Sequence, residues 1–144
     1  MQSSHIRSRT RARQIIDFRG LEYGTIKPTD IDALIEYNNQ AYVIVETKLG
    51  DTELPDGQQL ALERLTRDLS RQGKPTITII AEHNITDPEQ DIILADTMVR
   101  SYKHNQNPWH RCTLTTRQLI DNFLEHTAPP PPIHSYMRPR EAQR

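Results

Sequence analysis

The sequence is poor in several features that would otherwise narrow its class. It has one cysteine, Cys112, so it can form no intrachain disulfide, and a cysteine-rich zinc site is not expected. Cys112 stands in an apolar strand pattern typical of a small buried residue. No apolar run is long enough to cross a membrane, and residues 1–14 lack the hydrophobic region of a signal peptide. We therefore expect a cytoplasmic protein with no membrane partner.

Apolar residues are also scarce. Hydrophobic residues make up 35% of the 144 residues, against roughly 45–50% in a typical globular domain, an average that also counts glycine. Residues 1–14 hold four arginines and almost no large apolar residue, while residues 127–144 hold a run of four prolines and three arginines. We predict a flexible basic arm at 1–14, a single domain at 15–126 and a disordered proline-rich tail at 127–144.

The net charge of −1 hides an uneven distribution of charge. Residues 15–126 hold 11 basic and 18 acidic residues, so an acidic central part is flanked by basic ends. Basic arms of this kind can supply non-specific phosphate contacts to a nucleic acid. The alternative is that they are solvated segments without a partner.

The central part of the chain alternates between strand and helix patterns. Tyr42 to Val45 is apolar at every position, which is typical of a central strand covered on both faces, and Asn38-Asn39 before it indicates a hairpin turn. Short apolar or β-branched runs predict strands at residues 32–37, 41–48, 76–81 and 109–114. Residues 91–102 fit either a helix or a strand.

Two amphipathic patterns predict helices. The first spans 58–72, is capped by Asp56 and ends at Gly73; the second spans 115–125 and is capped by Thr115 or Thr116. Residues 13–19 suggest a further short helix. The predicted inner positions are Leu60, Ala61, Leu62, Leu65 and Leu69 in the first helix and Leu119, Ile120, Phe123 and Leu124 in the second. The order of elements predicts an α/β domain with a mixed central β-sheet flanked by helices.

Charged residues end the apolar strand at 41–48. Glu46 and Lys48 are two residues apart on a strand, so their side chains share a face, and Asp30 and Asp32 share a face by the same rule. Pairing of the two strands as a hairpin can bring Asp32 next to Glu46. Buried charged groups require a partner or a metal. The sequence therefore predicts that two carboxylates and one lysine converge.

This set suits metal-assisted hydrolysis of a phosphodiester. Mg²⁺ takes oxygen ligands, and Asp32, Glu46 and the backbone carbonyl of Thr47 can supply them. A bound cation lowers the pKa of the water that attacks phosphorus. Lys48 orients or deprotonates that water, or stabilises charge in the transition state, and the sequence does not separate these roles. The alternative is a plain ion pair between Glu46 and Lys48, with Asp30 and Asp32 in turns.

The segment Pro28-Thr29-Asp30-Ile31-Asp32, a short hairpin and then Glu46-Thr47-Lys48 resembles the PD-(D/E)XK signature. Restriction endonucleases, Holliday-junction resolvases and many phage or mobile-element nucleases carry this signature. The resemblance covers residues 13–83, and the rest only by the order of elements. It implies a restriction-endonuclease-like fold and a Mg²⁺- or Mn²⁺-dependent deoxyribonuclease, as endonuclease or exonuclease, that serves DNA processing or recombination for a phage or mobile element in its host cell. Many relatives act as homodimers.

The resemblance also assigns further site residues. Several subfamilies have a glutamine at the start of the following helix that helps to hold the metal or its water, which implies this role for Gln58, with Gln59 second. The motif here has one extra residue, so its aspartate is Asp32 or Asp30. Hairpin spacing favours Asp32, which lies 14 positions before Glu46.

Many family members add a glutamate from an N-terminal helix. Asp17 and Glu22 are the candidates for that additional carboxylate here.

Basic and aromatic residues supply candidate contacts to nucleic acid. Trp109, with His104 and His110 beside Lys103, can stack on a base, or Trp109 is a core residue. His83 follows the predicted strand 76–81 and can approach the site, or it is structural. The basic candidates, each with a solvated surface residue as the alternative, are Lys27, Arg64, Arg67, Arg71 and Lys103.

Two other functions compete with the nuclease. One keeps the fold but not the catalysis, as a module that binds nucleic acid or a protein partner. The other is an α/β interaction protein in which the motif is coincidental. Divalent-metal binding separates the second from the nuclease, because it requires a true carboxylate pair.

Overall fold

In the computed structural model, residues 13–127 are described. The chain divides after Asp30 into a unit of residues 1–30 and a unit of residues 31–144. The described part of the first unit, 13–30, contains turns and a single bridge between Tyr23 and Ile26. The short helix predicted at 13–19 is therefore wrong. Isolated helices this short are marginal, and Gly20 follows with a φ of 89°.

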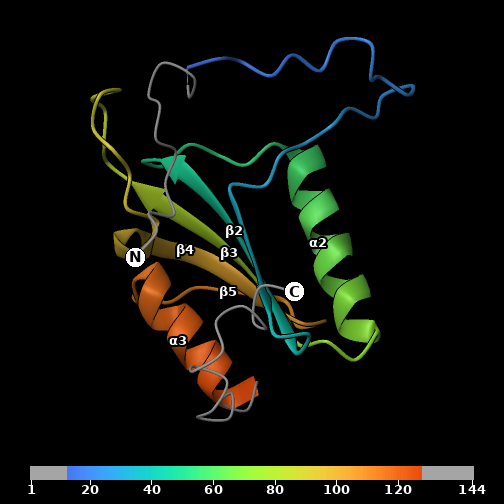
Figure 1. Ribbon diagram of the computed structural model, residues 1–144, viewed down its shortest axis with the longest axis vertical. Coiled ribbons are helices and arrows are strands. Elements are labelled where there is room, and N and C mark those ends of the chain that lie inside the picture. Colours follow the sequence, from blue (N-terminus) through green and yellow to red (C-terminus); the bar gives the residue numbers. More distant parts are fainter. Residues whose placement is uncertain (1–12, 128–144) are drawn as a thin grey trace. The chain divides into compact units, whose positions relative to one another are not determined.

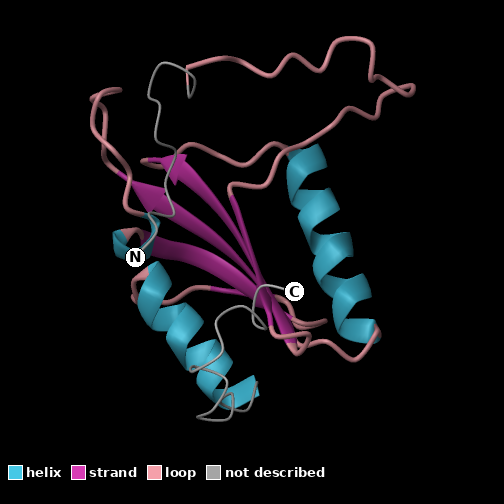
Figure 2. Ribbon diagram, viewed as in Figure 1, coloured by secondary structure: helices cyan, strands magenta, loops and turns pink. Residues whose placement is uncertain are grey.

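The second unit is a mixed α/β fold with a five-stranded sheet in the order β1-β2-β3-β4-β5. β2 and β3 are parallel, and every other neighbouring pair is antiparallel. Helices α2 and α3 lie on opposite faces of the sheet (Figures 1 and 2). The elements are β1 (Ala33–Tyr37), β2 (Ala41–Leu49), α2 (Asp56–Arg71), β3 (Thr76–His83), the 3₁₀ turn η1 (Leu94–Asp96), β4 (Met98–His104), β5 (Trp109–His110) and α3 (Thr116–Thr127).

The predicted hairpin between β1 and β2 is confirmed. Its turn places Asn38 and Asn39 at φ values of 49° and 60°, a left-handed conformation that asparagine tolerates better than most residues. Tyr37 then pairs with Ala41, and the ladder runs to Ala33 opposite Val45. This register fixes which residues of the two strands face each other beyond Ala33.

The sheet is buried on both faces. On the α3 face, Val43 and Ile79 pack with Leu119 and Phe123 of the helix. On the α2 face, the cluster consists of Ile44, Leu62 and Ile80. The prediction that Tyr42 to Val45 forms a central strand is confirmed, since β2 lies between β1 and β3 and alternates between these two clusters.

The inner face of α2 differs from the predicted leucine stripe. Leu62 is buried as predicted and Leu69 packs at the edge of the cluster, but Leu60 and Leu65 are exposed, as is Ala61. Gln58 and Thr66 take the inner positions instead.

Buried positions on α2 therefore recur every four residues from Gln58, and Thr66 reaches the hydroxyl of Thr78 on β3. Asp56 does not cap the helix: it is the first helical residue, and Pro55 precedes it without a side-chain cap.

The C-terminal elements resolve the ambiguous part of the sequence. Residues 91–102 form η1 and most of β4, and the predicted strand 109–114 shortens to β5. Thr115 caps α3: its hydroxyl accepts from the Gln118 N–H, and the Gln118 side chain accepts from the Thr115 N–H. The four predicted inner residues of α3 belong to the core cluster or pack against it. The predicted domain limits at 14 and 126 stay predictions, and the arm at 1–12 and the tail at 128–144 lie outside the described residues.

Candidate functional site

The β1–β2 hairpin brings Asp32 against Glu46. Because Ala33 pairs with Val45, the preceding residue Asp32 stands opposite Glu46 at the open end of the hairpin. The Asp32 N–H donates to Glu46 Oε2 at 3.4 Å, and the Thr47 N–H donates to Asp32 Oδ2 at 2.8 Å. The predicted convergence of these two carboxylates is therefore present in the structure.

Lys48 completes the predicted trio on the same face of β2. Its Nζ lies 3.3 Å from Glu46 Oε1. The Glu46 side chain is only 4% exposed, whereas the Lys48 side chain is 22% exposed. The carboxylate is thus held inside the site, while the ammonium lies at its rim and can reach a molecule from solvent.

Gln58 and Gln59 separate into different roles. Gln58 is on the buried face of α2 and hydrogen bonds to the Glu46 carboxylate. Gln59 points elsewhere, and its amide donates to Glu63 Oε1 at 3.2 Å. Of the two glutamines, Gln58 therefore contacts Glu46 and Gln59 does not, and the role that the resemblance implies for Gln58 stays a prediction.

Burial sets the charge state of Glu46. Loss of solvent raises the pKa of Glu46 above the ordinary value of 4.5, and the nearby Asp32 charge raises it further. Hydrogen bonds from Gln58 and Lys48, together with the Lys48 charge, act in the opposite direction and lower this pKa. The net shift is upward, so the folded protein holds the Glu46 proton more tightly than the unfolded chain does.

That upward shift predicts a pH-dependent difference in stability between wild-type protein and Glu46→Gln. A raised folded-state pKa contributes stability that is fully present below about pH 4.5 and is lost as pH rises through the folded-state value. The glutamine cannot ionise, so the free energy of unfolding of the variant should improve relative to wild type as pH rises from 3 to 7. Urea unfolding in metal-free buffer at several pH values measures this difference. A difference that stays constant, or moves the other way, contradicts the assigned environment of Glu46.

The donor set around Asp32 and Glu46 consists of oxygen atoms, the ligands that Mg²⁺ and Mn²⁺ prefer. In a strand, the N–H and C=O of one residue point to the same edge. Since the Thr47 N–H donates to Asp32, the Thr47 carbonyl faces that edge too. Within residues 13–127 no group of three or more His, Cys, Asp or Glu side chains is placed to hold a metal ion. The candidate centre therefore has two carboxylates and one carbonyl, which suits a cation that keeps several waters.

Four predicted candidates belong to the first unit and not to the unit that holds this site: Asp17, Glu22, Lys27 and Asp30. Asp17 accepts hydrogen bonds from the backbone N–H and the guanidinium of Arg19. Their predicted roles stay predictions.

His83, on β3, has a local role. Its Nδ1 accepts from the Ile85 N–H at 3.1 Å. It stands three residues after Ile80, which packs on the α2 face, so the His83 side chain leaves the opposite face of the sheet from Glu46.

The predicted basic residues of α2 gather on one surface. Arg64, Arg67 and Arg71 line a hollow of about 410 Å³ together with Lys103 of β4. The helical spacing of three and four residues predicted the arginine row, while the sheet brings in Lys103. This surface carries three cations of α2 and one of β4, beside the carboxylate of Glu63.

Sequence reasoning missed Arg100. Its guanidinium donates to the carbonyls of Gly50 and Thr52 and to Glu82, at 2.6, 2.7 and 3.2 Å. Arg100 thus stabilises the loop that follows β2, which begins two residues after Lys48. Arg100 belongs to residues 91–102, whose pattern fits a helix or a strand equally well. The direction of its side chain follows only from the pairing of β4 with β3.

Comparisons of the chain with protein-family models, with curated proteins and with solved structures give no match. Among residues 13–127, neither helix has the length and apolar character needed to cross a membrane.

Proposed function

We propose that the protein is a Mg²⁺- or Mn²⁺-dependent nuclease that hydrolyses phosphodiester bonds in DNA. One observation carries the proposal: the β1–β2 hairpin brings Asp32, Glu46 and Lys48 together with Gln58 of the following helix. These are the residues that the PD-(D/E)XK resemblance assigns to one active site. An ion pair alone would explain Glu46 and Lys48, but it leaves the cost of a second carboxylate beside a buried one to be offset by a single hydrogen bond from the Thr47 N–H.

Asp32, Glu46 and the Thr47 carbonyl would hold the divalent cation. When bound, the cation neutralises phosphate charge and lowers the pKa of a coordinated water. Gln58 keeps the Glu46 carboxylate in place through its hydrogen bond. Two carboxylates, Asp32 and Glu46, lie beside the single ammonium of Lys48, so a second positive charge at this point is favourable.

Lys48 is the residue that meets the reacting groups. It lies at the rim, beside the carboxylate rather than behind it, with 22% of its side chain exposed. From there its ammonium can orient the attacking water or stabilise negative charge that develops on the phosphate.

The surface of Arg64, Arg67, Arg71 and Lys103 is the proposed contact for the DNA backbone. It lies along α2, the same helix that brings Gln58 to the site. Arginine and lysine contacts to phosphate provide the part of binding that does not depend on sequence.

The finer classification rests on the same resemblance. The hairpin, the helix after it and the parallel strand β3 occur in the order that a restriction-endonuclease-like fold requires. On this basis the proposed setting is DNA processing or recombination for a phage or mobile element in the host cytoplasm. The same resemblance favours a homodimer, in which each copy would cut one strand of duplex DNA.

Divalent cations are expected to raise the melting temperature of the wild-type protein at neutral pH and to leave Glu46→Gln almost unchanged. A ligand that binds only the folded state stabilises it by an amount that grows with its concentration, about 2.7 kcal/mol at 100 times Kd. Differential scanning fluorimetry with Mg²⁺, Mn²⁺ or EDTA measures the shift. Glu125→Gln, an exposed residue of α3, is the matched control and should respond as wild type does. Equal shifts in all three proteins would place the cation elsewhere.

A further inference from the structure

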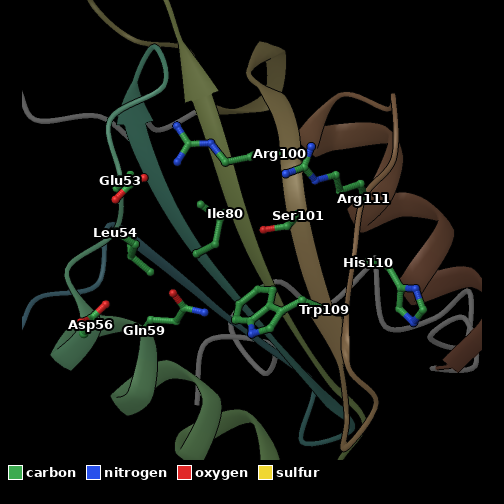
Figure 3. Close-up of a pocket in the computed structure, with 10 residues that line it drawn as sticks. All are labelled: Glu53, Leu54, Asp56, Gln59, Ile80, Arg100, Ser101, Trp109, His110 and Arg111. Atoms are coloured by element: carbon green, nitrogen blue, oxygen red, sulfur yellow. The ribbon is translucent and has the colours of Figure 1, made fainter.

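A hollow of about 490 Å³ opens on the α2 face of the sheet beside the candidate site (Figure 3). Its floor includes Ile80 of β3 and Ser101 of β4, which pair with each other. Ile80 is also the residue that pairs with Glu46. Neighbouring strands are about 4.8 Å apart, so the hollow begins one strand away from Glu46. Its volume lies within the range of about 300–1,000 Å³ that is usual for small-ligand pockets.

Trp109 is held firmly at this hollow. Its indole N–H donates to Glu63 Oε1 at 2.8 Å, and Gln59 donates to the same oxygen. The ring packs against the Ile44, Leu62 and Ile80 cluster and also lines the hollow. In Figure 3 it lies beside Gln59 and below Ser101. A fixed aromatic ring at the edge of a hollow is what a stacked base requires.

Charged residues of both signs line the hollow. Arg100 and Arg111 stand on one side, with Glu53 and Asp56 across from them (Figure 3). Arg100 is occupied by the loop carbonyls and Glu82. Arg111 is exposed, and within residues 13–127 its side chain has no hydrogen bond or ion pair.

Two carboxylates would repel a bare phosphate, but they can accept hydrogen bonds from the amino groups of a base, as can Gln59 and Ser101. The mixed lining therefore favours a nucleobase over a free phosphate.

We propose that this hollow binds an unpaired base of the strand whose phosphate lies at Glu46, with the base on Trp109 and the adjoining phosphate at Arg111. This proposal rests on the proposed nuclease function and names its substrate class: DNA with unpaired nucleotides next to the scissile bond. A base in a continuous duplex must first leave its stack, which costs a few kcal/mol. A single strand, a frayed end or a branch presents the base without that cost.

Trp109 is the only tryptophan of the chain, so tryptophan emission, excited where the five tyrosines do not absorb, reports on this hollow. The experiment titrates the full-length protein in EDTA with a short oligothymidylate and with a duplex of the same length. The single strand is expected to quench the emission and to saturate at the lower concentration. Binding without any change in Trp109 emission, or tighter binding of the duplex, would overturn the proposal.

Variants give an independent measure through the anisotropy of a labelled oligothymidylate. Trp109→Leu is expected to weaken binding by about five- to 150-fold, equivalent to the 1–3 kcal/mol of one stacked base. Arg111→Ala should weaken it as well, and it removes an exposed side chain that makes no hydrogen bond or ion pair with the residues from 13 to 127. Arg117→Ala, an exposed arginine of α3 on the other face of the sheet, is the control and should bind like wild type. Equal affinity in all four proteins would overturn the proposal. If Trp109→Leu fails to fold, Arg111→Ala decides alone, and binding equal to wild type in that variant would overturn the proposal.

These experiments can refute either proposal without refuting the other. Quenching and weakened variants without cutting in Mg²⁺ would support the base-binding hollow and remove the nuclease. Metal-dependent cutting of duplex DNA with no response of Trp109 would support the nuclease and overturn the hollow.

Discussion

Lys48→Ala is expected to lower the rate of metal-dependent DNA cutting by about a hundredfold or more, the scale of a lost acid–base or electrostatic contribution. The variant should keep its divalent-cation stabilisation, because the oxygen donors of Asp32, Glu46 and Thr47 are untouched. The single-turnover rate on the preferred substrate measures the loss. It separates Lys48, which acts on the reacting groups, from residues that hold the cation.

Arg117→Ala is the charge-matched control for this measurement. It also removes one positive charge, but from the exposed surface of α3 on the other face of the sheet. If Lys48→Ala cut DNA as fast as the control, Lys48 would be only the partner of Glu46, and the active-site assignment would be wrong.

Leu62→Ala is expected to reduce the free energy of unfolding by about 2–5 kcal/mol, because it opens a cavity in a packed interior. Leu62 is 1% exposed and joins α2 to Ile44 and Ile80 of the sheet. Leu60, two residues earlier on the same helix, is 44% exposed. Leu60→Ala should therefore change stability by no more than about 0.5 kcal/mol. Urea unfolding of the two variants and wild type gives the comparison.

Similar losses from both leucine variants would mean that α2 packs through the whole leucine stripe that the sequence pattern suggested. The consequence reaches the site, because a helix rotated to bury Leu60 and Leu65 would carry Gln58 away from Glu46.

The β1–β2 hairpin and its site could be predicted from sequence because the information is local. The Asn38-Asn39 turn sets the hairpin, and the two-residue alternation then fixes Glu46 and Lys48 on one face. The distance between Asp32 and Glu46 follows from the same turn. The contact of Gln58 with Glu46 was implied by the resemblance and could not be derived from the pattern, since Gln58 is a polar residue at a buried helix position.

Elements that depend on distant partners were harder to predict. Leu60, Leu62 and Leu65 all suit the apolar stripe of an amphipathic helix. Packing against the sheet selects Leu62 for the inner face, and Gln58 and Thr66 take the other inner positions. Residues 91–102 carry apolar residues without a clear period. Their C-terminal part becomes β4 because it pairs with β3, a strand that the local pattern does not reveal as its partner. The hollow at Trp109 is of this kind, because α2, β4 and β5 each supply part of it.

The most direct test of the central claim is the cutting assay itself, with wild-type protein and Glu46→Gln on plasmid, linear, single-stranded and branched DNA, each in Mg²⁺, Mn²⁺ or EDTA. We predict cutting by wild type in either metal, none in EDTA, and a loss of about a hundredfold or more in Glu46→Gln. Cutting in EDTA, or equal cutting by the two proteins, would contradict a metal site built on Glu46. No cutting of any substrate, with no divalent-cation stabilisation, would contradict the nuclease and leave a fold that binds without catalysis.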